Sequence, residues 1–340
     1  MIKALAQRGH RVTFLERDVP WYRSSRDITK TNYCRIELYN ELRDIPARFG
    51  TLVADADLVI LGSFVPQGAI IGDWITSRAS GITAFYDIDT PCTLTALEDG
   101  ALDYLTPSLI PRFDLYLSFT GGPTLNLIEE LYGSPCARPL YCTADTSLHA
   151  PLDRPKDWSL GYLGTYSKDR QAPLEQLLVE PALALPDTQF VVAGAQYPNW
   201  LHWPDNVARI EHCPPHEHPR FYSRQCYTLN VTRANMISAG YSPSVRLFEA
   251  AACGVPVISD RWEGIESFFT PGKEILIAET AAEVTRLLTE LSEARRLGIA
   301  AAARNRYLAS HTPAHRAKQI EEYYAEIKRK PARVLAEGVA

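Results

Sequence analysis

The chain has 340 residues, of which 46% are hydrophobic and 22% are charged, and its formal net charge is −5. This composition is typical of a globular protein with room for two domains, and the acidic balance gives no reason to expect nucleic acid binding. No apolar run reaches the roughly 18 residues that a membrane-spanning helix needs, and residues 1–10 lack the apolar core of a signal peptide. We therefore expect a cytoplasmic protein without a transmembrane segment.

Basic residues are in excess in the first 35 positions, where Lys3, Arg8, Arg11, Arg17, Arg23, Arg26, Lys30 and Arg35 outnumber Glu16, Asp18 and Asp27. Two interpretations stay open: a solvated face, or a contact for an acidic acceptor or an anionic membrane surface. The seven cysteines form no Cys-x-x-Cys pair and are odd in number, so we expect buried free thiols in a reducing compartment.

The chain opens on an amphipathic helix that ends at Gly9. Apolar, strand-like runs then alternate with helix-like segments, at residues 12–15, 58–61, 82–86 and 115–119 and again at 160–163, 189–193, 227–231, 255–259 and 275–278. This alternation predicts a parallel sheet wound with helices in each half. A segment rich in proline and small polar residues, 141–155, marks the junction, and we place domains at 1–148 and 149–312 and a last helix at 313–330 that crosses back to the first domain.

Doubly wound domains normally begin with a central strand and a glycine-rich turn, but this chain opens on what looks like the following helix. Without the first strand, its two neighbours would lose a ladder partner in the middle of a sheet. We hypothesise that the natural protein begins about 15 to 25 residues upstream, enough for one strand and its turn.

The segment 242–260 reads as a capped helix that ends at Gly254 and continues into a buried strand. Ser242 is the expected N-cap and Pro243 the first helical residue, which leaves the N–H groups of Ser244 and Val245 to face an anion such as a phosphate.

Val245, Phe248 and Ala252 form an apolar stripe on this helix, and Arg246 and Glu249 lie on another side. Since a carboxylate only accepts hydrogen bonds, Glu249 could bind both hydroxyls of a ribose. The alternative is an ordinary helix-to-strand unit in which Glu249 is solvated or paired with Arg246.

Residues 161–170 run from a strand into a helix, with a glycine at position 164. Glycine at a strand end lets a ligand approach the backbone, and Lys168 or Arg170 could neutralise a diphosphate. A plain turn with exposed cations is the alternative.

Taken together these segments resemble GT-B glycosyltransferases, and most closely the CgeB-like family of bacterial glycosyltransferases. The resemblance rests on residues 85–91, 118–122, 161–170, 192–194, 230–233, 240–249 and 254–260. It implies an α/β fold of two Rossmann-like domains facing a cleft, with the first domain on the acceptor side. It further implies transfer of a hexosyl group from a nucleoside diphosphate sugar to an unidentified acceptor, without a metal or other cofactor.

The resemblance also assigns residues. It makes Glu249 the ribose ligand, the backbone of Ser244 and Val245 diphosphate ligands, and Arg170 a phosphate or cleft residue. Many retaining GT-B enzymes have a second glutamate at the donor sugar, eight residues before the ribose glutamate, but Tyr241 stands there in this chain. Retention of the anomeric configuration is therefore not implied.

Asp87 and Asp89 follow the strand 82–86 at the carboxyl edge of the first sheet, where open α/β sheets place their sites. Either one could be the general base that deprotonates an acceptor hydroxyl. Two alternatives stay open: the Asp-x-Asp motif holds a divalent metal in GT-A glycosyltransferases, and Asp89 could cap the next helix.

Gly121 and Gly122 follow the strand 115–119 and either line the acceptor side of the cleft or form a close-packed turn. The segment 212–218 holds three histidines and a cysteine at a spacing that fits no common zinc module. We prefer a role for His216 at the nucleotide or in helix entry. Two other functions remain: an epimerase or hydrolase of the same fold acting on a nucleoside diphosphate sugar, or a non-catalytic protein that binds sugar nucleotides.

Overall fold

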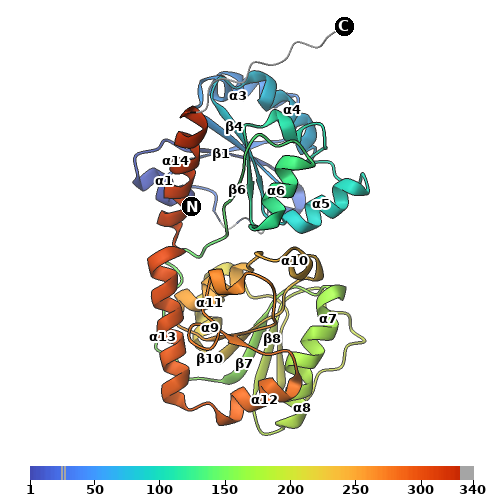
Figure 1. Ribbon diagram of the computed structural model, residues 1–340, viewed down its shortest axis with the longest axis vertical. Helices are drawn as coiled ribbons and strands as arrows, with labels where there is room; N and C mark the ends of the chain where they lie inside the picture. The colour runs from blue at the N-terminus through green and yellow to red at the C-terminus, as the bar shows by residue number, and fades with distance from the viewer. Residues whose placement is uncertain (24–25, 27, 330–340) are drawn as a thin grey trace. The chain divides into compact units, whose positions relative to one another are not determined.

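The computed structural model describes residues 1–23, 26 and 28–329, which form two compact units (Figure 1). Unit 1 contains Met1–Ser118, Leu125–Leu140 and the segment from Arg316 onward. Unit 2 contains Phe119–Thr124 and Tyr141–His315. Apart from the short stretch Phe119–Thr124, unit 2 begins at Tyr141, the first residue of the predicted junction segment 141–155. Residue 330, the predicted end of the last helix, lies outside the described residues, as does Asp27.

Unit 1 holds two separate parallel sheets. One pairs β1 (Thr13–Arg17) with β2 (Arg35–Tyr39), and the other has the order β3 (Leu58–Gly62), β4 (Ile82–Asp87), β5 (Leu115–Ser118), β6 (Ala137–Pro139). The helices are α1 (Ile2–Gln7), α2 (Pro20–Arg23), α3 (Asp44–Asp55), α4 (Gly68–Arg78), α5 (Thr90–Glu98), the 3₁₀-helix η1 (Ile110–Arg112), α6 (Pro123–Glu130) and α14 (Pro313–Arg329), which begins in unit 2.

Helices cover both faces of the larger sheet of unit 1. On one face, Ile45, Phe49 and Val53 of α3, spaced by four residues, pack in one cluster with Ile71 of α4 and Phe85 of β4. On the other face, Leu115 and Leu117 of β5 pack with α14 and α1 through Ile320 and Leu5. Strands buried on both faces have continuous apolar runs, which is why β4 and β5 are visible in the sequence.

Unit 2 has one parallel sheet with the order β12-β11-β10-β7-β8-β9. Its strands are β7 (Trp158–Leu163), β8 (Phe190–Ala193), β9 (Val207–Ile210), β10 (Gln225–Asn230), β11 (Val257–Ser259) and β12 (Leu276–Ile277). The chain builds outward from β7 on one side and returns to build outward from β10 on the other, which is the doubly wound Rossmann order. The expected fold class, a doubly wound α/β sheet, is confirmed for unit 2.

The first strand of unit 2, β7, is central and joins β8 to β10. Among the described residues, unit 1 has no strand in the corresponding place, because β1–β2 and β3–β6 remain two sheets.

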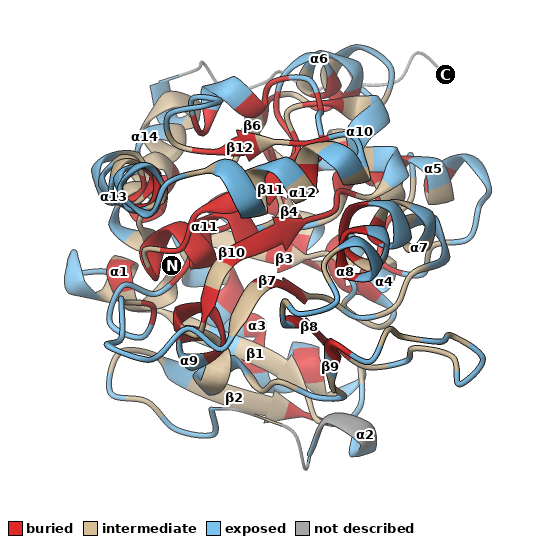
Figure 2. Cartoon of the chain, turned by 90° about the horizontal axis from the view of Figure 1, so that it is seen from below, coloured by how far each residue is buried: buried red, intermediate tan, exposed pale blue. Residues whose placement is uncertain are grey.

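Two hydrophobic layers enclose the sheet of unit 2; β8 and β11 are buried at every residue and β10 at all but one (Figure 2). One layer carries α7 (Lys168–Leu174), the π-helix η2 (Glu175–Val179), α8 (Glu180–Ala184) and α12 (Ala281–Glu290). The other carries α9 (His218–Ser223), α11 (Val245–Ala252) and α13 (Glu293–Ser310). Shorter elements are α10 (Ala234–Ala239) and the 3₁₀-helices η3 (Pro215–Glu217) and η4 (Ile265–Ser267).

The helix predicted to start at Ser242 starts later. Ser244 is the N-cap of α11, with extended backbone angles of φ −76° and ψ 152°, and Val245 is the first helical residue. The hydroxyl of Ser242 instead lies 2.8 Å from that of Thr120, so a tertiary hydrogen bond takes the residue that the local pattern assigned to capping. The predicted apolar stripe also differs, because Val245 is 46% exposed while Arg246 and Glu249 are buried.

Several of the basic residues near the N-terminus are paired within unit 1. Arg26 contacts Glu16 and Asp18 at 2.9 and 3.0 Å, and Arg8 pairs with Glu321 of α14 at 2.5 Å. These contacts favour the interpretation of a solvated, ion-paired face. No helix in the described part of the chain is both long and apolar enough to cross a membrane, and none of the seven cysteines, all described, is in a disulfide.

Candidate functional site

The candidate donor site of unit 2 lies where the strand order reverses, at the carboxyl ends of β7 and β10. Open α/β sheets bind ligands at this point because the loops after two neighbouring strands diverge there and leave a crevice. Gly164 follows β7, Asn230 ends β10, and α11 begins beside them. The first N–H groups of a helix have no partner inside the helix and carry the positive end of its dipole, so the start of α11 can attract an anion.

Arg246 of α11 bridges the two strands at this point. Its Nε atom donates to the carbonyl of Leu163 at 2.8 Å, and its Nη1 atom donates to Oδ1 of Asn230 at 2.9 Å. The guanidinium also lies over the ring of Tyr162, 4.7 Å from the ring centre, and the residue is only 7% exposed. The positive charge of Arg246 is thus held in the crevice by three neutral groups, the Leu163 carbonyl, the Asn230 side chain and the Tyr162 ring. None of these groups neutralises the charge.

A buried polar network holds the start of α11 in place. Ser244 donates to Oδ1 of Asn230 at 2.7 Å, and the amide of Asn230 donates to the hydroxyls of Ser259 and Thr232. Asp260 accepts hydrogen bonds from both the backbone and the hydroxyl of Thr232. Because every member has partners, the network gives the end of β10 and the start of α11 one defined arrangement.

Gly164 is required by its surroundings. A β-carbon at this position would lie 2.7 Å from the hydroxyl of Tyr162 and 3.0 Å from Nη2 of Arg246. Of the two predicted cations in the following turn, Lys168 is exposed, whereas Arg170 is half-buried and donates to the carbonyl of Thr165 at 2.8 Å. Nε of Arg170 is buried and has no hydrogen-bond acceptor among the described residues.

Tyr241, which occupies the place of the sugar-binding glutamate of retaining enzymes, is held tightly by two glycines. A β-carbon on Gly122 would come within 2.3 Å of the Tyr241 ring, and one on Gly264 within 2.4 Å. Both glycines and Tyr241 itself have positive φ angles, at 59°, 86° and 47°. The carbonyl of Tyr241 accepts a hydrogen bond from the N–H of Gly121 at 3.0 Å. The alternative of a close-packed turn therefore accounts for Gly121 and Gly122.

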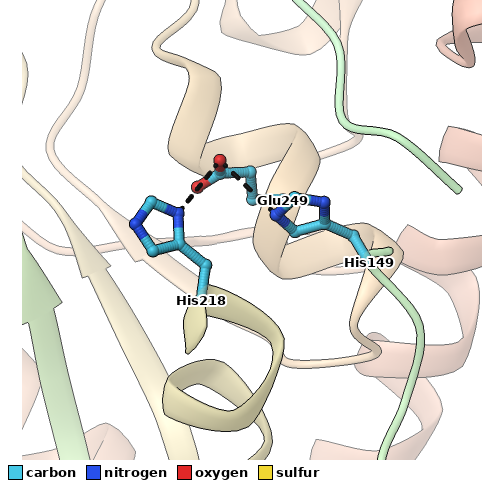
Figure 3. A group of neighbouring side chains, drawn as sticks. All are labelled: His149, His218 and Glu249. Carbon is cyan, nitrogen blue, oxygen red and sulfur yellow. Dashed lines mark hydrogen bonds and ion pairs between the residues drawn. The ribbon is translucent and has the colours of Figure 1, made fainter. Parts of the chain in front are cut away.

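Glu249 lies at the centre of a second group of side chains, formed with His149 and His218 (Figure 3). Its Oε1 atom is 3.3 Å from Nδ1 of His218 and 3.6 Å from Nε2 of His149, and its Oε2 atom accepts a hydrogen bond of 2.9 Å from Tyr222. His149 comes from the segment after β6, His218 and Tyr222 from α9, and Glu249 from α11. The predicted alternative of an ion pair with Arg246 is not realised.

This group stabilises the ionised form of Glu249. Burial alone would raise the pKa of the carboxyl, but His149 and His218 outweigh burial and lower the pKa to about 2. For His218, burial lowers the pKa, and the carboxylate of Glu249 raises it by more, so the net shift is upward. Glu249 is therefore a carboxylate at neutral pH. Each oxygen has two lone pairs, and the bonds from Tyr222 and His218 leave one acceptor position on each.

Asp87 and Asp89, the predicted catalytic residues of unit 1, lie in different environments. Asp87 is fully buried and accepts hydrogen bonds from Tyr116 at 2.6 Å, from Thr93 at 2.9 Å and from the N–H of Asp89 at 3.2 Å. Burial raises the pKa of Asp87 despite these donors. A side chain enclosed in this way ties β4 to β5 and α5, which is a structural role. Asp89 is half-buried at the N-cap of α5, and its side chain makes no capping hydrogen bond.

His216 is exposed and borders a surface hollow of about 480 Å³, together with Leu148, Leu152, Arg154, Glu217, Pro219 and Arg220. His212 is exposed as well, so of the three histidines in the segment 212–218 only His218 points into the group around Glu249. The role of His149 had no signal in the sequence, because its partners are distant along the chain.

Comparison with known proteins places this site in a family context. Residues 170–322 match the family described as Glycosyl transferase-like. This match covers less than half of the chain. No curated protein matches the chain at a significant level.

Solved structures of glycosyltransferases are similar along nearly the whole chain. Anabaena Alr3699/HepE in complex with UDP and glucose has 13% identity and a TM-score of 0.71, covering 96% of this chain and 94% of that one. Sucrose-phosphate synthase from Thermosynechococcus elongatus has 16% identity and a TM-score of 0.63, over 96% and 91%. An alpha-glucosyltransferase in complex with UDP-glucose and DNA containing an abasic site has 12% identity and a TM-score of 0.66, over 94% and 92%.

These similarities confirm the predicted fold class, the α/β fold of GT-B glycosyltransferases with two Rossmann-like units. The predicted enzyme class, a glycosyltransferase, is confirmed at the level of the family description. The closer assignment to the CgeB-like family stays a prediction.

Proposed function

We propose that this protein transfers a sugar from a nucleoside diphosphate sugar to an acceptor, without a metal ion. The observation that carries the proposal is that α11 begins beside Gly164, at the point where the strand order reverses. Arg246 is held there by hydrogen bonds to Leu163 and Asn230. Nucleotide ligands of open α/β sheets bind at such a point. The family description of residues 170–322 supports the same conclusion.

In this proposal the diphosphate binds at the start of α11. The N–H groups of the first turn and the charge of Arg246 stabilise the negative charge that builds up on the departing diphosphate. Lys168 and Arg170 add positive charge from the turn after β7. Since these groups can supply the neutralisation that a divalent cation supplies elsewhere, a metal is not needed for departure of the diphosphate.

Glu249 is the proposed ligand of the ribose hydroxyls. Its carboxylate is ionised and retains one acceptor position on each oxygen. Similar structures were determined with UDP, UDP-glucose or UDP and GlcNAc, so a UDP-sugar is the first donor to test.

For the acceptor, we propose that Asp89 rather than Asp87 acts as the general base. Asp87 is enclosed by three donors, whereas Asp89 is half-buried at the carboxyl edge of the sheet of unit 1. A general base has to reach the hydroxyl hydrogen of its substrate, which an enclosed side chain cannot do.

The test is a thermal-shift screen with UDP, GDP, dTDP, CDP and ADP, each with and without magnesium, on the wild type and on Glu249→Ala. At about 100 times its Kd, a ligand should stabilise the folded protein by roughly 2.7 kcal/mol. One nucleotide should raise the melting temperature equally with and without magnesium, and the variant should lose this rise. Equal shifts with all five nucleotides, or a shift that needs magnesium, would contradict the proposal.

A second candidate function, a non-catalytic protein that binds sugar nucleotides, is favoured by one observation. Tyr241 fills the place of the sugar-binding glutamate and is locked between Gly122 and Gly264. Release of UDP from a UDP-sugar distinguishes the candidates. Release without an acceptor indicates a hydrolase, release only with an acceptor indicates a transferase, and binding without release in either case indicates the binding protein.

A further inference from the structure

The contacts of His218 in the buried group around Glu249 fit either a protonated imidazole or a bound metal cation. Nε2 of His218 lies 3.2 Å from the carbonyl oxygen of Cys213. A carbonyl oxygen only accepts hydrogen bonds, so Nε2 must carry a hydrogen and donate it. In the neutral ring Nδ1 is then a lone pair, and it points at Oε1 of Glu249 from 3.3 Å. Two acceptors face each other at this distance only if a proton or a metal cation lies between them.

His149 points to the same atom. Its Nε2 is 3.6 Å from Oε1 of Glu249, and its residue is only 7% exposed. Neither ring nitrogen of His149 has a hydrogen-bond partner among the described residues. A buried imidazole nitrogen that makes no hydrogen bond is unfavourable. A cation bound at Nε2 would remove part of that cost.

We propose that His149, His218 and Glu249 form a binding site for Zn²⁺. The three ligand atoms lie within 4.8 Å of one another, from three separate segments of unit 2. In a tetrahedral zinc site with bonds of about 2.0 to 2.1 Å, neighbouring ligand atoms are about 3.3 to 3.5 Å apart. The two distances to Oε1, 3.3 and 3.6 Å, are close to the edges of such a tetrahedron.

The surroundings of the three ligands are those of a metal site. His218 donates its other ring hydrogen to a backbone carbonyl, and Glu249 accepts a hydrogen bond from Tyr222, so both ligands are oriented from outside. Two imidazoles and one carboxylate suit zinc and leave one coordination position for a water molecule.

Zinc at this site would regulate the proposed donor binding, and this consequence rests on the proposed function. Glu249 cannot give Oε1 to a metal and keep the same acceptor position for a ribose hydroxyl. Zinc and nucleotide should therefore compete, in contrast to the cations that assist sugar transfer by binding the diphosphate.

The experiment is equilibrium dialysis of the full chain against ZnCl₂, with bound metal measured by elemental analysis. We expect one bound zinc per chain, and affinity at least ~10-fold weaker in His149→Gln and in His218→Gln. His212→Gln is the matched control, because His212 lies in the same loop as His218 but is exposed and outside the site. Loss of zinc binding in His212→Gln, or no binding by the wild type, would overturn the proposal.

A second measurement on the wild type keeps the test valid if the histidine variants fail to fold. Co²⁺ in a four-coordinate site with nitrogen and oxygen ligands absorbs visible light strongly, whereas six-coordinate Co²⁺ absorbs weakly. Strong absorption that zinc displaces supports the site, and only weak absorption overturns it.

Nucleotide binding is measured on the same samples so that the two proposals can fail separately. If UDP or another nucleotide binds but zinc does not, the group is a plain imidazolium–carboxylate cluster and the zinc proposal fails alone. If zinc binds and no nucleotide does, the proposed function fails and the metal site stands. If both bind, zinc at saturation should raise the apparent Kd of the nucleotide.

Discussion

Gly264→Ala should destabilise unit 2 through two separable effects. The first is backbone strain, because Gly264 has a φ of 86° and an alanine in that region costs about 1 to 2 kcal/mol. The second is overlap with the Tyr241 ring, since the new β-carbon would lie 2.4 to 2.7 Å from three of its atoms. Overpacking of this kind costs about 1 to 3 kcal/mol, so we expect a total loss of about 2 to 5 kcal/mol.

Gly272 provides a control that separates strain from overlap. It has a similar φ of 75°, but a β-carbon there meets nothing within 4 Å. Gly272→Ala should therefore lose only about 1 to 2 kcal/mol. Differential scanning calorimetry measures both variants, and each kcal/mol corresponds to roughly 2 to 4 °C for a domain of this size.

The overlap can also be removed from the other side. In a Tyr241→Ala background, Gly264→Ala should cost no more than the control, which corresponds to a coupling energy of about 1 to 3 kcal/mol. The described packing of Tyr241 between the two glycines is contradicted if Gly264→Ala and Gly272→Ala lower the melting temperature equally. It is also contradicted if Gly264→Ala is as destabilising in the Tyr241→Ala background as in the wild type.

Three further predictions follow from the two units. In unit 1, Asp87→Asn should lower the free energy of unfolding by about 1 to 3 kcal/mol, because an amide replaces a buried carboxylate that accepts three hydrogen bonds. Asp89→Asn should leave the melting temperature unchanged and slow sugar transfer by about 10²- to 10⁴-fold. The reverse pattern in calorimetry and turnover would contradict the assignment. Arg246→Lys should weaken nucleotide binding by at least ~10-fold in calorimetric titration, since an ammonium cannot reach both strands of the crevice, and unchanged affinity would refute its role. The pKa of Glu249 is about 2 in the folded protein, against an ordinary 4.5. Its ionised form therefore contributes roughly 3 kcal/mol to the free energy of unfolding above pH 4.5, and this contribution is lost as pH falls toward 2. Urea unfolding over this range should show a smaller loss of stability in Glu249→Gln than in the wild type.

The sequence predicts the parts of the fold whose signal is local. β4 and β5 are continuous apolar runs because both of their faces are covered, and they were found close to their observed bounds. β2 was missed because Arg35 and Glu37 interrupt its apolar residues, and β6 was missed because it has only three residues. Strands of this kind are set by pairing with a neighbour, which no local pattern reveals.

In the candidate site, too, only the features with a local sequence signal could be predicted. Gly164 and the helix after residue 244 could be located from the sequence because turn glycines and capping residues act locally. The helix start was misplaced by two residues, since Ser242 and Ser244 are equally good caps and only the contact of Ser242 with Thr120 decides between them. His149 could not be predicted, because its position beside Glu249 depends on how distant segments pack.

The central claim is that Glu249 binds the ribose of a nucleoside diphosphate. The most direct measurement is calorimetric titration of the nucleotide chosen by the thermal-shift screen and of its 2′-deoxy form, with the wild type and Glu249→Ala. A hydrogen bond to a charged group contributes about 1.5 to 3 kcal/mol, so the wild type should bind the ribose form roughly 10- to 100-fold more tightly, and Glu249→Ala should bind both forms equally. Equal affinity of the wild type for the two forms, or a preference that persists in Glu249→Ala, would contradict the account.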